Sequence, residues 1–169
     1  DAQTTPNGNT ALGFSALSSV VDTGFHTAVG FSALNSNTSG TNNTAVGGYS
    51  GYSNTSGDAN ASFGYSSLRL NTTGAYNTAL GSYALYTQTE SDKNTAIGYY
   101  ALFNNTTGTR NVAVGSNAMD ANTTGGDNNA FGENALGGNT TGSDNCAFGR
   151  LSLSANTTGV SNCAFGHAT

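Results

Sequence analysis

The apolar residues of this chain recur at a spacing of 17 residues, which is the period of neither a helix nor a strand. Each copy carries a phrase like Asn77-Thr78-Ala79-Leu80-Gly81, which we number as positions 1 to 5 of the repeat. Its glycine occurs ten times with no insertion between copies: Gly13, Gly30, Gly47, Gly64, Gly81, Gly98, Gly115, Gly132, Gly149 and Gly166. A short fixed period is typical of a solenoid, in which each repeat forms one coil stacked on the next. We therefore expect residues 1–169 to form a single repeat domain of ten coils with no internal boundary.

Two columns of large apolar residues run through the repeats. Position 4 is apolar in all ten copies: Leu12, Val29, Val46, Phe63, Leu80, Ile97, Val114, Phe131, Phe148 and Phe165. Position 9 is Leu or Met in every copy that reaches it except one, where it is Gly51. Positions 3 and 8 beside these columns hold only Ala, Ser or Thr. Because alternate residues of a strand point to opposite sides, positions 3 and 4 cannot both face one interior. We expect one face to be buried within the coil and the other against another chain, and the pattern leaves open which is which.

The residue types of the repeat favour strands over helices. Gly and β-branched Thr occupy much of each copy, and the apolar residues lack helical spacing. Short strands separated by Gly, Asn and Thr turns fit better, with flanks at positions 16 to 4 and 6 to 11. The corners would lie at the position 5 glycine and at an Asn-Thr-Thr/Ser-Gly block that begins at Asn37, Asn54, Asn71, Asn105, Asn122, Asn139 and Asn156. The sequence therefore predicts an all-β parallel β-solenoid of ten 17-residue coils, about 4.8 Å apart and about 48 Å long.

The chain is expected to associate with other copies. Two large side chains per coil make a thin core, so stacked Asn side chains, backbone ladders and association must stabilise the rest. The chain starts at position 10 and stops at position 8, with no polar capping coil. Open solenoid ends present unpaired backbone groups, so we expect either a piece of a longer chain or end-to-end stacking in a filament.

The repeated phrase carries a family resemblance. Asn-Thr-Ala-x-Gly-x-x-Ala-Leu followed by Asn-Thr-Thr-Gly resembles the repeats of phage-type tail-fibre and bacterial surface-fibre proteins, and it covers essentially the whole chain. It is also similar to the head repeats of trimeric autotransporter adhesins, which form left-handed parallel β-rolls. The repeat here is longer and adds the Asn-Thr-Thr-Gly block. The resemblance implies a left-handed β-roll, trimeric assembly and an extracellular location.

Composition and charge exclude several classes of function. The net charge is −5 and only 8% of residues are charged, without a basic cluster. Nucleic-acid binding needs Lys and Arg to displace counterions, so we expect none. No apolar run approaches the roughly 20 residues of a membrane span, so we expect no membrane insertion. Polar low-complexity chains are often disordered, but the apolar column at position 4 argues for a folded one.

Residues capable of catalysis or metal binding do not form a recognisable set. His26 lies in the Asn column at position 1 and His167 near the end, and neither has the partners of a catalytic triad. Asp58, Asp127 and Asp144 lie in or beside the turn block and differ between copies, so they are interpreted as solvated turn residues. We expect no enzyme activity, no metal and no cofactor.

The two cysteines and the Asn-x-Ser/Thr sequences have plain structural interpretations. Cys146 and Cys163 share position 2 with Thr and Val, without a Cys-x-x-Cys spacing, and we expect free thiols. Their Cα atoms should lie within disulfide range, but stacked parallel side chains rarely take the required torsion. The seven Asn-Thr-Thr/Ser blocks would be glycan acceptors in a eukaryotic secreted chain, and turn chemistry in a bacterial or phage one.

Tyrosine is the residue type that breaks the repetition, since all eight copies fall between Tyr49 and Tyr100. Position 10 reads Tyr52, Arg69, Tyr86 and Phe103 over four consecutive coils. Such a stripe could stack on sugar rings, because Tyr combines an apolar body with a polar tip. The alternatives are a wider cross-section or a contact between chains.

Two functions remain after these exclusions. The first is a non-enzymatic structural or adhesive segment of an extracellular fibre, which associates with itself as a homotrimer or filament and contacts cell-surface glycans. The second is a monomeric solenoid that binds a repetitive ligand, either a glycan or ice. The Thr column at position 13, from Thr38 to Thr157, is the candidate for ice, although it lies in a turn rather than on a flat face.

Overall fold

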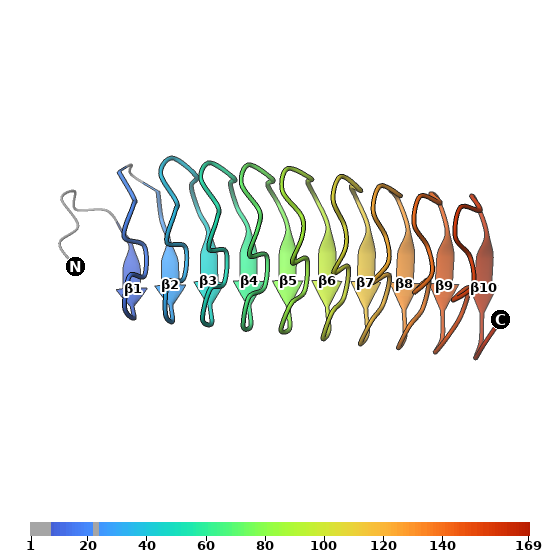
Figure 1. The fold of residues 1–169 in the computed structure, drawn as a ribbon. Coiled ribbons are helices and arrows are strands. Elements are labelled where there is room, and N and C mark those ends of the chain that lie inside the picture. Colours follow the sequence, from blue (N-terminus) through green and yellow to red (C-terminus); the bar gives the residue numbers. More distant parts are fainter. Residues whose placement is uncertain (1–7, 22–23) are drawn as a thin grey trace.

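A computed structural model describes residues 8–21 and 24–169 of the chain. These residues form one ten-stranded parallel sheet and contain no helix. The strands are β1 (Thr10–Leu12), β2 (Thr27–Val29), β3 (Thr44–Val46), β4 (Ala61–Phe63), β5 (Thr78–Leu80), β6 (Thr95–Ile97), β7 (Val112–Val114), β8 (Asn129–Phe131), β9 (Cys146–Phe148) and β10 (Cys163–Phe165). Each strand pairs with the next in the sequence (Figure 1). Every strand residue lies beside its counterpart 17 positions away in the neighbouring strand. The prediction of a parallel β-solenoid with 17-residue coils is confirmed.

The second flank of the coil is not a strand, so the prediction of an extended segment at positions 6 to 11 is wrong. Its residues at positions 7 and 9 adopt left-handed backbone angles, as in Tyr83 (φ 61°) and Leu85 (φ 52°). The segment still bonds to the next coil, since the Leu85 N–H donates to the Ala101 carbonyl at 3.0 Å. Alternating left-handed residues curve the chain tightly around a small core while every second N–H keeps its partner in the adjacent coil.

The two apolar columns have different environments. Within the strands, position 3 faces inward and position 4 outward, so Ala79 is 0% exposed and Leu80 is 47% exposed. On the second flank both Ala84 and Leu85 are buried, because the alternation rule applies only to extended chain. The expectation of a restricted outward-facing column on both flanks is therefore corrected: it holds for the strands alone. One large side chain per coil, rather than two, fills the interior.

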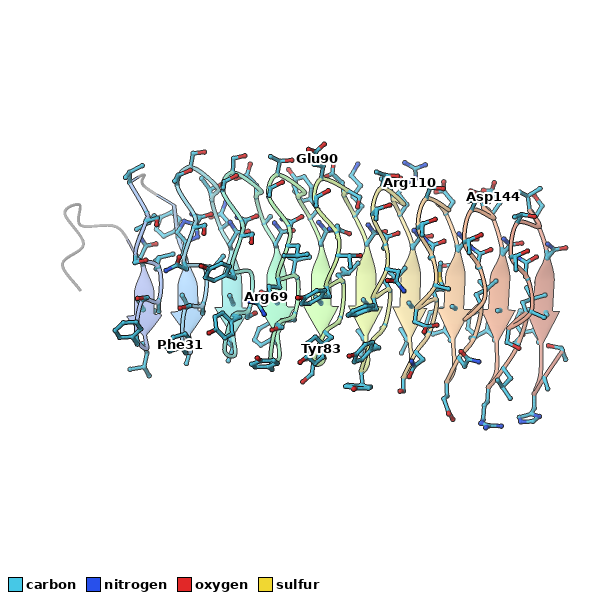
Figure 2. All side chains as sticks on the ribbon, in the orientation of Figure 1. Phe31, Arg69, Tyr83, Glu90, Arg110 and Asp144 are labelled. Atoms are coloured by element: carbon cyan, nitrogen blue, oxygen red, sulfur yellow. The ribbon has the colours of Figure 1, made fainter. Side chains whose placement is uncertain are left out.

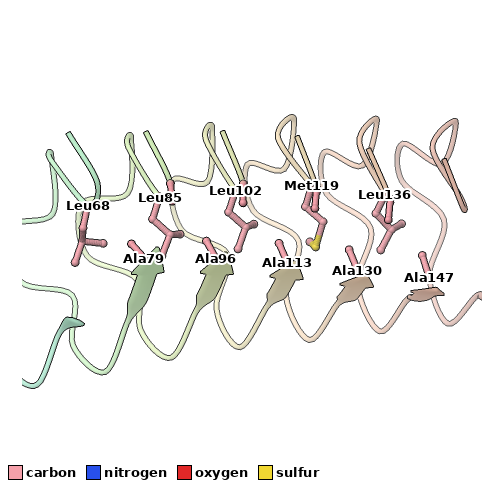
Figure 3. Packing of buried hydrophobic residues seen from close by; sticks show 14 residues of the cluster. Leu68, Ala79, Leu85, Ala96, Leu102, Ala113, Met119, Ala130, Leu136 and Ala147 are labelled. Atoms are coloured by element: carbon pink, nitrogen blue, oxygen red, sulfur yellow. The ribbon is translucent and has the colours of Figure 1, made fainter. Parts of the chain in front are cut away.

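The interior apolar core consists of interleaved Ala and Leu side chains (Figure 3). It is divided into two clusters, one in coils 1 to 3 and a longer one in coils 4 to 9. Gly51 removes the Leu side chain at the division. There the Ser50 hydroxyl donates to the Ser62 hydroxyl at 2.7 Å and lies 3.0 Å from that of Ser67. A short polar network thus interrupts the apolar column.

Two columns of buried Asn side chains, at positions 1 and 12, run beside the apolar core. At position 12, the Asn122 amide donates to the Asn105 side-chain oxygen at 2.8 Å and to the Gly125 carbonyl at 3.0 Å. At position 1, the side-chain oxygen of Asn94 accepts from the backbone N–H of Asn111 at 3.0 Å. Among the described residues, no buried side-chain nitrogen or oxygen lacks a hydrogen-bond partner. The Asn columns therefore link consecutive coils without the penalty of unpaired polar groups.

Val20 interrupts the position 12 column in coil 1, whereas two other exceptions keep a hydrogen bond to the next coil. Gln88 occupies position 12 of coil 5, and its side-chain oxygen accepts from Asn94 at 2.9 Å. His26 occupies position 1 of coil 2, and its Nδ1 accepts from the Asn43 N–H at 3.2 Å. Both side chains are buried, which is consistent with a structural role for each.

The glycine at position 5 is required by two constraints at once. At Gly64, φ is 136°, which side-chain-bearing residues rarely adopt. A Cβ there would lie 2.6 Å from the carbonyl carbon of Gly81 in the next coil. The backbones of successive coils therefore meet too closely at this corner for any other residue.

Because position 3 faces the interior, Ala96→Arg should unfold the protein. The site has no room for the side chain and no partner for its charge, so the free energy of unfolding should fall by about 4 kcal/mol or more. Thr95→Arg, one residue earlier and facing outward, is the matched control and should fold. Circular dichroism and thermal melting distinguish them, and a folded Ala96→Arg protein that only changes its association state would contradict the assignment.

The buried Asn column predicts a pH-dependent defect in Asn122→Asp. A carboxylate there would place oxygen against the Asn105 and Gly125 oxygens, so the folded-state pKa of the new Asp would rise. The loss of stability should be about 3 kcal/mol at pH 7, should shrink as the pH falls below the raised folded-state pKa, and should be smallest below about pH 4, where the unfolded carboxyl is also protonated. Asn42→Asp, at the exposed position 17 where Asp127 and Asp144 occur naturally, should change little. Urea titrations at pH 7 and pH 3.5 make the comparison, and equal losses at both would refute it.

Candidate binding surfaces

The outward side of the sheet forms the first candidate surface. This outer sheet face consists of positions 2 and 4 of all ten coils, and no charged residue occurs at either position. Its position 4 residues are half-buried or exposed throughout, with Leu12 and Phe165 at the two ends each 67% exposed. In the last three coils Phe131, Phe148 and Phe165 stack in register, with centroid distances of 4.5 and 5.2 Å. The face is a continuous, uncharged apolar stripe along the solenoid.

The second candidate is an aromatic surface at positions 6, 7 and 10 of the first six coils. Its members, with Arg69, are Phe14, Phe31, Tyr49, Tyr52, Tyr65, Tyr83, Tyr86, Tyr99, Tyr100 and Phe103. Figure 2 shows Phe31 and Tyr83 along one edge of the solenoid, away from Glu90, Arg110 and Asp144 at the opposite edge. Ring contacts connect these coils without a gap from Phe14 to Phe103.

The four residues singled out from the sequence lie within this surface. Tyr86 and Phe103 stack at 5.2 Å, and the Arg69 guanidinium lies 5.9 Å from the Tyr52 ring centroid. Arg69 is closer to Tyr49, at 4.6 Å. The position 10 stripe is thus one column of a wider array.

Sequence reasoning missed the aromatic residues at positions 6 and 7. Tyr49 contacts Tyr52 at 5.7 Å, Tyr83 contacts Tyr86 at 5.7 Å, and Tyr100 contacts Phe103 at 4.5 Å. In an extended strand, positions 7 and 10 would point to opposite sides. The left-handed residues place them together, and the i, i+3 spacing of three aromatic pairs was the available signal.

Tyr100 lies in the tightly packed part of the aromatic surface, and the pKa of its phenol is shifted. Its pKa is raised, first because the packed rings desolvate the phenolate and also because of its hydrogen bond with Tyr99 and the neighbouring phenol charges. The hydroxyl therefore remains a neutral donor and acceptor at physiological pH.

The acidic residues at the opposite edge accept hydrogen bonds from backbone N–H groups or form ion pairs with basic side chains. The Asp58 carboxylate accepts from the Thr41 N–H at 2.7 Å, in the preceding coil. Arg110 forms a bidentate pair with Asp127, at 2.6 and 2.7 Å, which lowers the pKa of that carboxyl. Asp144 is exposed one coil further on. These contacts support the interpretation of Asp58, Asp127 and Asp144 as turn residues.

The two histidines of the chain lie in separate environments. His26 is buried in the Asn column, and the His167 ring contacts the Arg150 guanidinium at 2.9 Å. No group of three or more His, Cys, Asp or Glu side chains in residues 8–21 and 24–169 is arranged to hold a metal ion. Over the same residues, no helix is long and apolar enough to cross a membrane.

The Thr column at position 13 is bonded to the backbone. The Thr106 hydroxyl donates to the Thr123 carbonyl at 2.9 Å, and Thr123 donates likewise to Thr140. Thr38, Thr55, Thr72 and Thr140 make the same contact with the following coil. These hydroxyl groups therefore stabilise the corner of the coil. This structural role explains the Thr column better than a flat ligand-binding array does.

The Asn residues that open the Asn-Thr-Thr/Ser blocks point inward. Asn71, Asn105, Asn122 and Asn139 are fully buried and committed to the ladder at position 12. In the folded coil these side-chain nitrogens are inaccessible to a glycosylating enzyme. The blocks therefore supply corner and ladder chemistry.

Comparison with known proteins gives no further assignment. No protein-family model matches the chain, and no match was found among curated proteins or solved structures.

The cysteines lie side by side on the outer sheet face as free thiols. Burial raises the pKa of the Cys146 thiol, and the adjacent Cys163 raises it further. Alkylation without reductant should modify both, with Cys163 reacting first because it is exposed. The rate at Cys146 should still be rising at pH 9, since a higher pKa leaves less thiolate at any given pH. Peptide mass spectrometry measures both rates, and recovery of unmodified, disulfide-linked peptides would contradict the prediction.

Proposed function

We propose that this chain is a structural segment of an extracellular fibre, of the tail-fibre or surface-adhesin kind, that associates with further copies of itself. The observation that carries the proposal is the outer sheet face, which stays apolar at position 4 in every coil although solvent reaches it. The resemblance of the repeat to fibre proteins supports the extracellular location and a three-chain assembly.

The outer sheet face has properties that suit contact between identical chains. Position 4 contributes nothing to the interior of its own coil, yet no copy carries a polar residue there. By contrast, position 6 varies from Phe14 to Glu133 and Arg150. Extended apolar patches on a protein surface typically mark an interaction site. Because the face is uncharged, two copies can meet without placing like charges together.

The architecture also suits a spacer. Each coil contacts only its neighbours, and each added coil extends the stack by about 4.8 Å. A shaft of chosen length can therefore be built by repeating one unit, without redesigning a core. A homotrimer packed through the outer sheet faces would bury the apolar stripe over the full length of the shaft.

Charges on the outer sheet face should dissociate the assembly and leave the coil folded. The test variant is Leu80→Glu, Ile97→Glu and Val114→Glu together, on three consecutive strands. Size-exclusion chromatography with light scattering should show an oligomer for the unmodified protein and a monomer for the variant. The fall in affinity should be at least a hundredfold, because each Glu would be desolvated at the interface.

The control carries the same charge elsewhere. Thr73→Glu, Thr107→Glu and Thr124→Glu lie at position 14, the exposed column in which Glu90 already occurs. This variant should keep the assembly, and circular dichroism should show both variants folded. A stable monomer of the unmodified protein at micromolar concentration would defeat the proposal, and appreciable thermal hysteresis would favour the ice-binding alternative.

A further inference from the structure

We propose that the aromatic surface of coils 1 to 6 is a carbohydrate-binding site that takes a linear polysaccharide along the solenoid axis. The proposal is independent of the self-association described above, since it uses a different edge of the coil. It is carried by two observations: the confinement of the rings to part of the solenoid, and their combination with a guanidinium that has no carboxylate partner among the described residues.

The fold does not require tyrosine at position 7. Tyr49, Tyr83 and Tyr100 have φ values of 58°, 61° and 58°, in the left-handed region that bulky residues avoid. Asn tolerates this region, and Asn117 and Asn134 occupy the same position with φ values of 57° and 55°. The aromatic side chains are thus held where Asn would relieve strain. Position 7 adopts this angle in all ten coils, including Leu151 outside the aromatic surface, so the angle belongs to the fold and the choice of tyrosine does not.

The surface ends abruptly although the backbone continues. In coils 7 to 10, positions 6, 7 and 10 contain no aromatic residue except the imidazole of His167, and Asp120 follows Phe103 in the position 10 column. The strand register and the buried columns at positions 3, 8 and 9 continue beyond that point. The solenoid itself therefore shows that these coils form without the rings.

The ring geometry offers both faces and hydroxyl groups. Tyr65 and Tyr99 flank Tyr83 at interplanar angles of 77° and 83°, and they are 47% and 54% exposed. Aromatic faces are electron-rich and attract the polarised C–H groups on the apolar side of a sugar ring. The phenol groups can exchange hydrogen bonds with sugar hydroxyls. The coil spacing of about 4.8 Å is close to the length of one pyranose unit, so a polymer lying along the axis would advance by about one sugar per coil.

Arg69 supplies the polar anchor. Arg110 and Arg150 form ion pairs with Asp127 and Glu133, whereas Arg69 has no carboxylate partner among the described residues. Its guanidinium lies over Tyr49, and its one side-chain hydrogen bond reaches Ser66 Oγ at 3.5 Å. Positions 6, 7 and 10 of the first six coils contain no acidic residue. Most of the five guanidinium donors are therefore available to the hydroxyl or carboxylate oxygens of a saccharide.

A polysaccharide fits this chemistry better than the other polymers that bind aromatic surfaces. Single-stranded nucleic acid also stacks on aromatic rings, but its binding needs a positively charged groove. The aromatic surface carries one Arg, in a chain whose net charge is −5. A second copy of the chain would find a more uniform contact on the outer sheet face, where position 4 is apolar in every coil.

The test replaces rings with residues that the same positions already hold elsewhere. The ligand-defective variant combines Tyr65→Ser, Tyr83→Asn, Tyr99→Ser and Tyr100→Asn. Ser occurs naturally at position 6 in Ser82 and Ser116, and Asn at position 7 in Asn117 and Asn134. The control is Tyr76→Ser, an exposed tyrosine at position 17, where Ser161 has nearly the same φ. Affinity electrophoresis in gels containing hydroxyethylcellulose, xylan, polygalacturonate or alginate measures the retardation of each protein.

We expect at least one polymer to retard the unmodified protein and the Tyr76→Ser control equally. The fourfold variant should bind at least tenfold more weakly, with a melting temperature that is unchanged or higher. Arg69→Ala should weaken binding to the polyuronates more than to the neutral polymers if the anchor meets a carboxylate, and equally if it meets hydroxyls. Because the chain has no Trp, tyrosine fluorescence of the unmodified protein should report binding independently of any variant.

Three outcomes would overturn the proposal. The first is no retardation of the unmodified protein by any of the four polymers. The second is equal retardation of the fourfold variant, which would place binding elsewhere. The third is a fourfold variant that changes oligomeric state or loses stability, which would assign the rings to self-association or to the fold.

Discussion

Hydrogen bonds between successive coils hold this structure together and constrain its sequence. The backbone of each coil bonds to both neighbours, and the two Asn columns repeat the link inside the core. An amide can donate to one neighbour and accept from the other, so it propagates through a stack of any length. Inserting one residue in a single repeat would displace both Asn columns from their partners at once. This is why ten copies keep the same length while their surface residues differ widely.

The interior is correspondingly small and partly polar. Ala at positions 3 and 8 allows the two walls to approach, and one Leu per coil fills the space between them. A substitution in such a core cannot be compensated by local repacking, because each buried side chain packs between the equivalent side chains of the coils above and below it. The fold therefore tolerates change on its surface and very little inside it. Gln88 and His26 are accepted within because each keeps a hydrogen bond to the following coil.

The period, the sheet and the corner glycines could be predicted from the sequence because they depend on spacing and on backbone sterics. The orientation of positions 3 and 4 could not, since alternation allows two solutions and both columns are restricted. The second flank was mispredicted because Leu85 and Tyr83 adopt left-handed angles against their own preferences. That error concealed most of the aromatic surface. Only the position 10 column was recognised, although Tyr49, Tyr83 and Tyr100 lie three residues before members of it.

The serine network around Gly51 has a consequence for cooperativity. In a linear array, each coil is stabilised by its two neighbours, and unfolding spreads until it meets a weak interface. The replacement of Leu by Gly51, and of Ala by Ser50, Ser62 and Ser67, removes apolar contact at one interface near the N-terminal end. The apolar contact between the first three coils and the longer C-terminal block is therefore weaker than the contact within either block. Under tension along the solenoid axis, the interface around Gly51 is expected to yield before the interfaces within either apolar cluster.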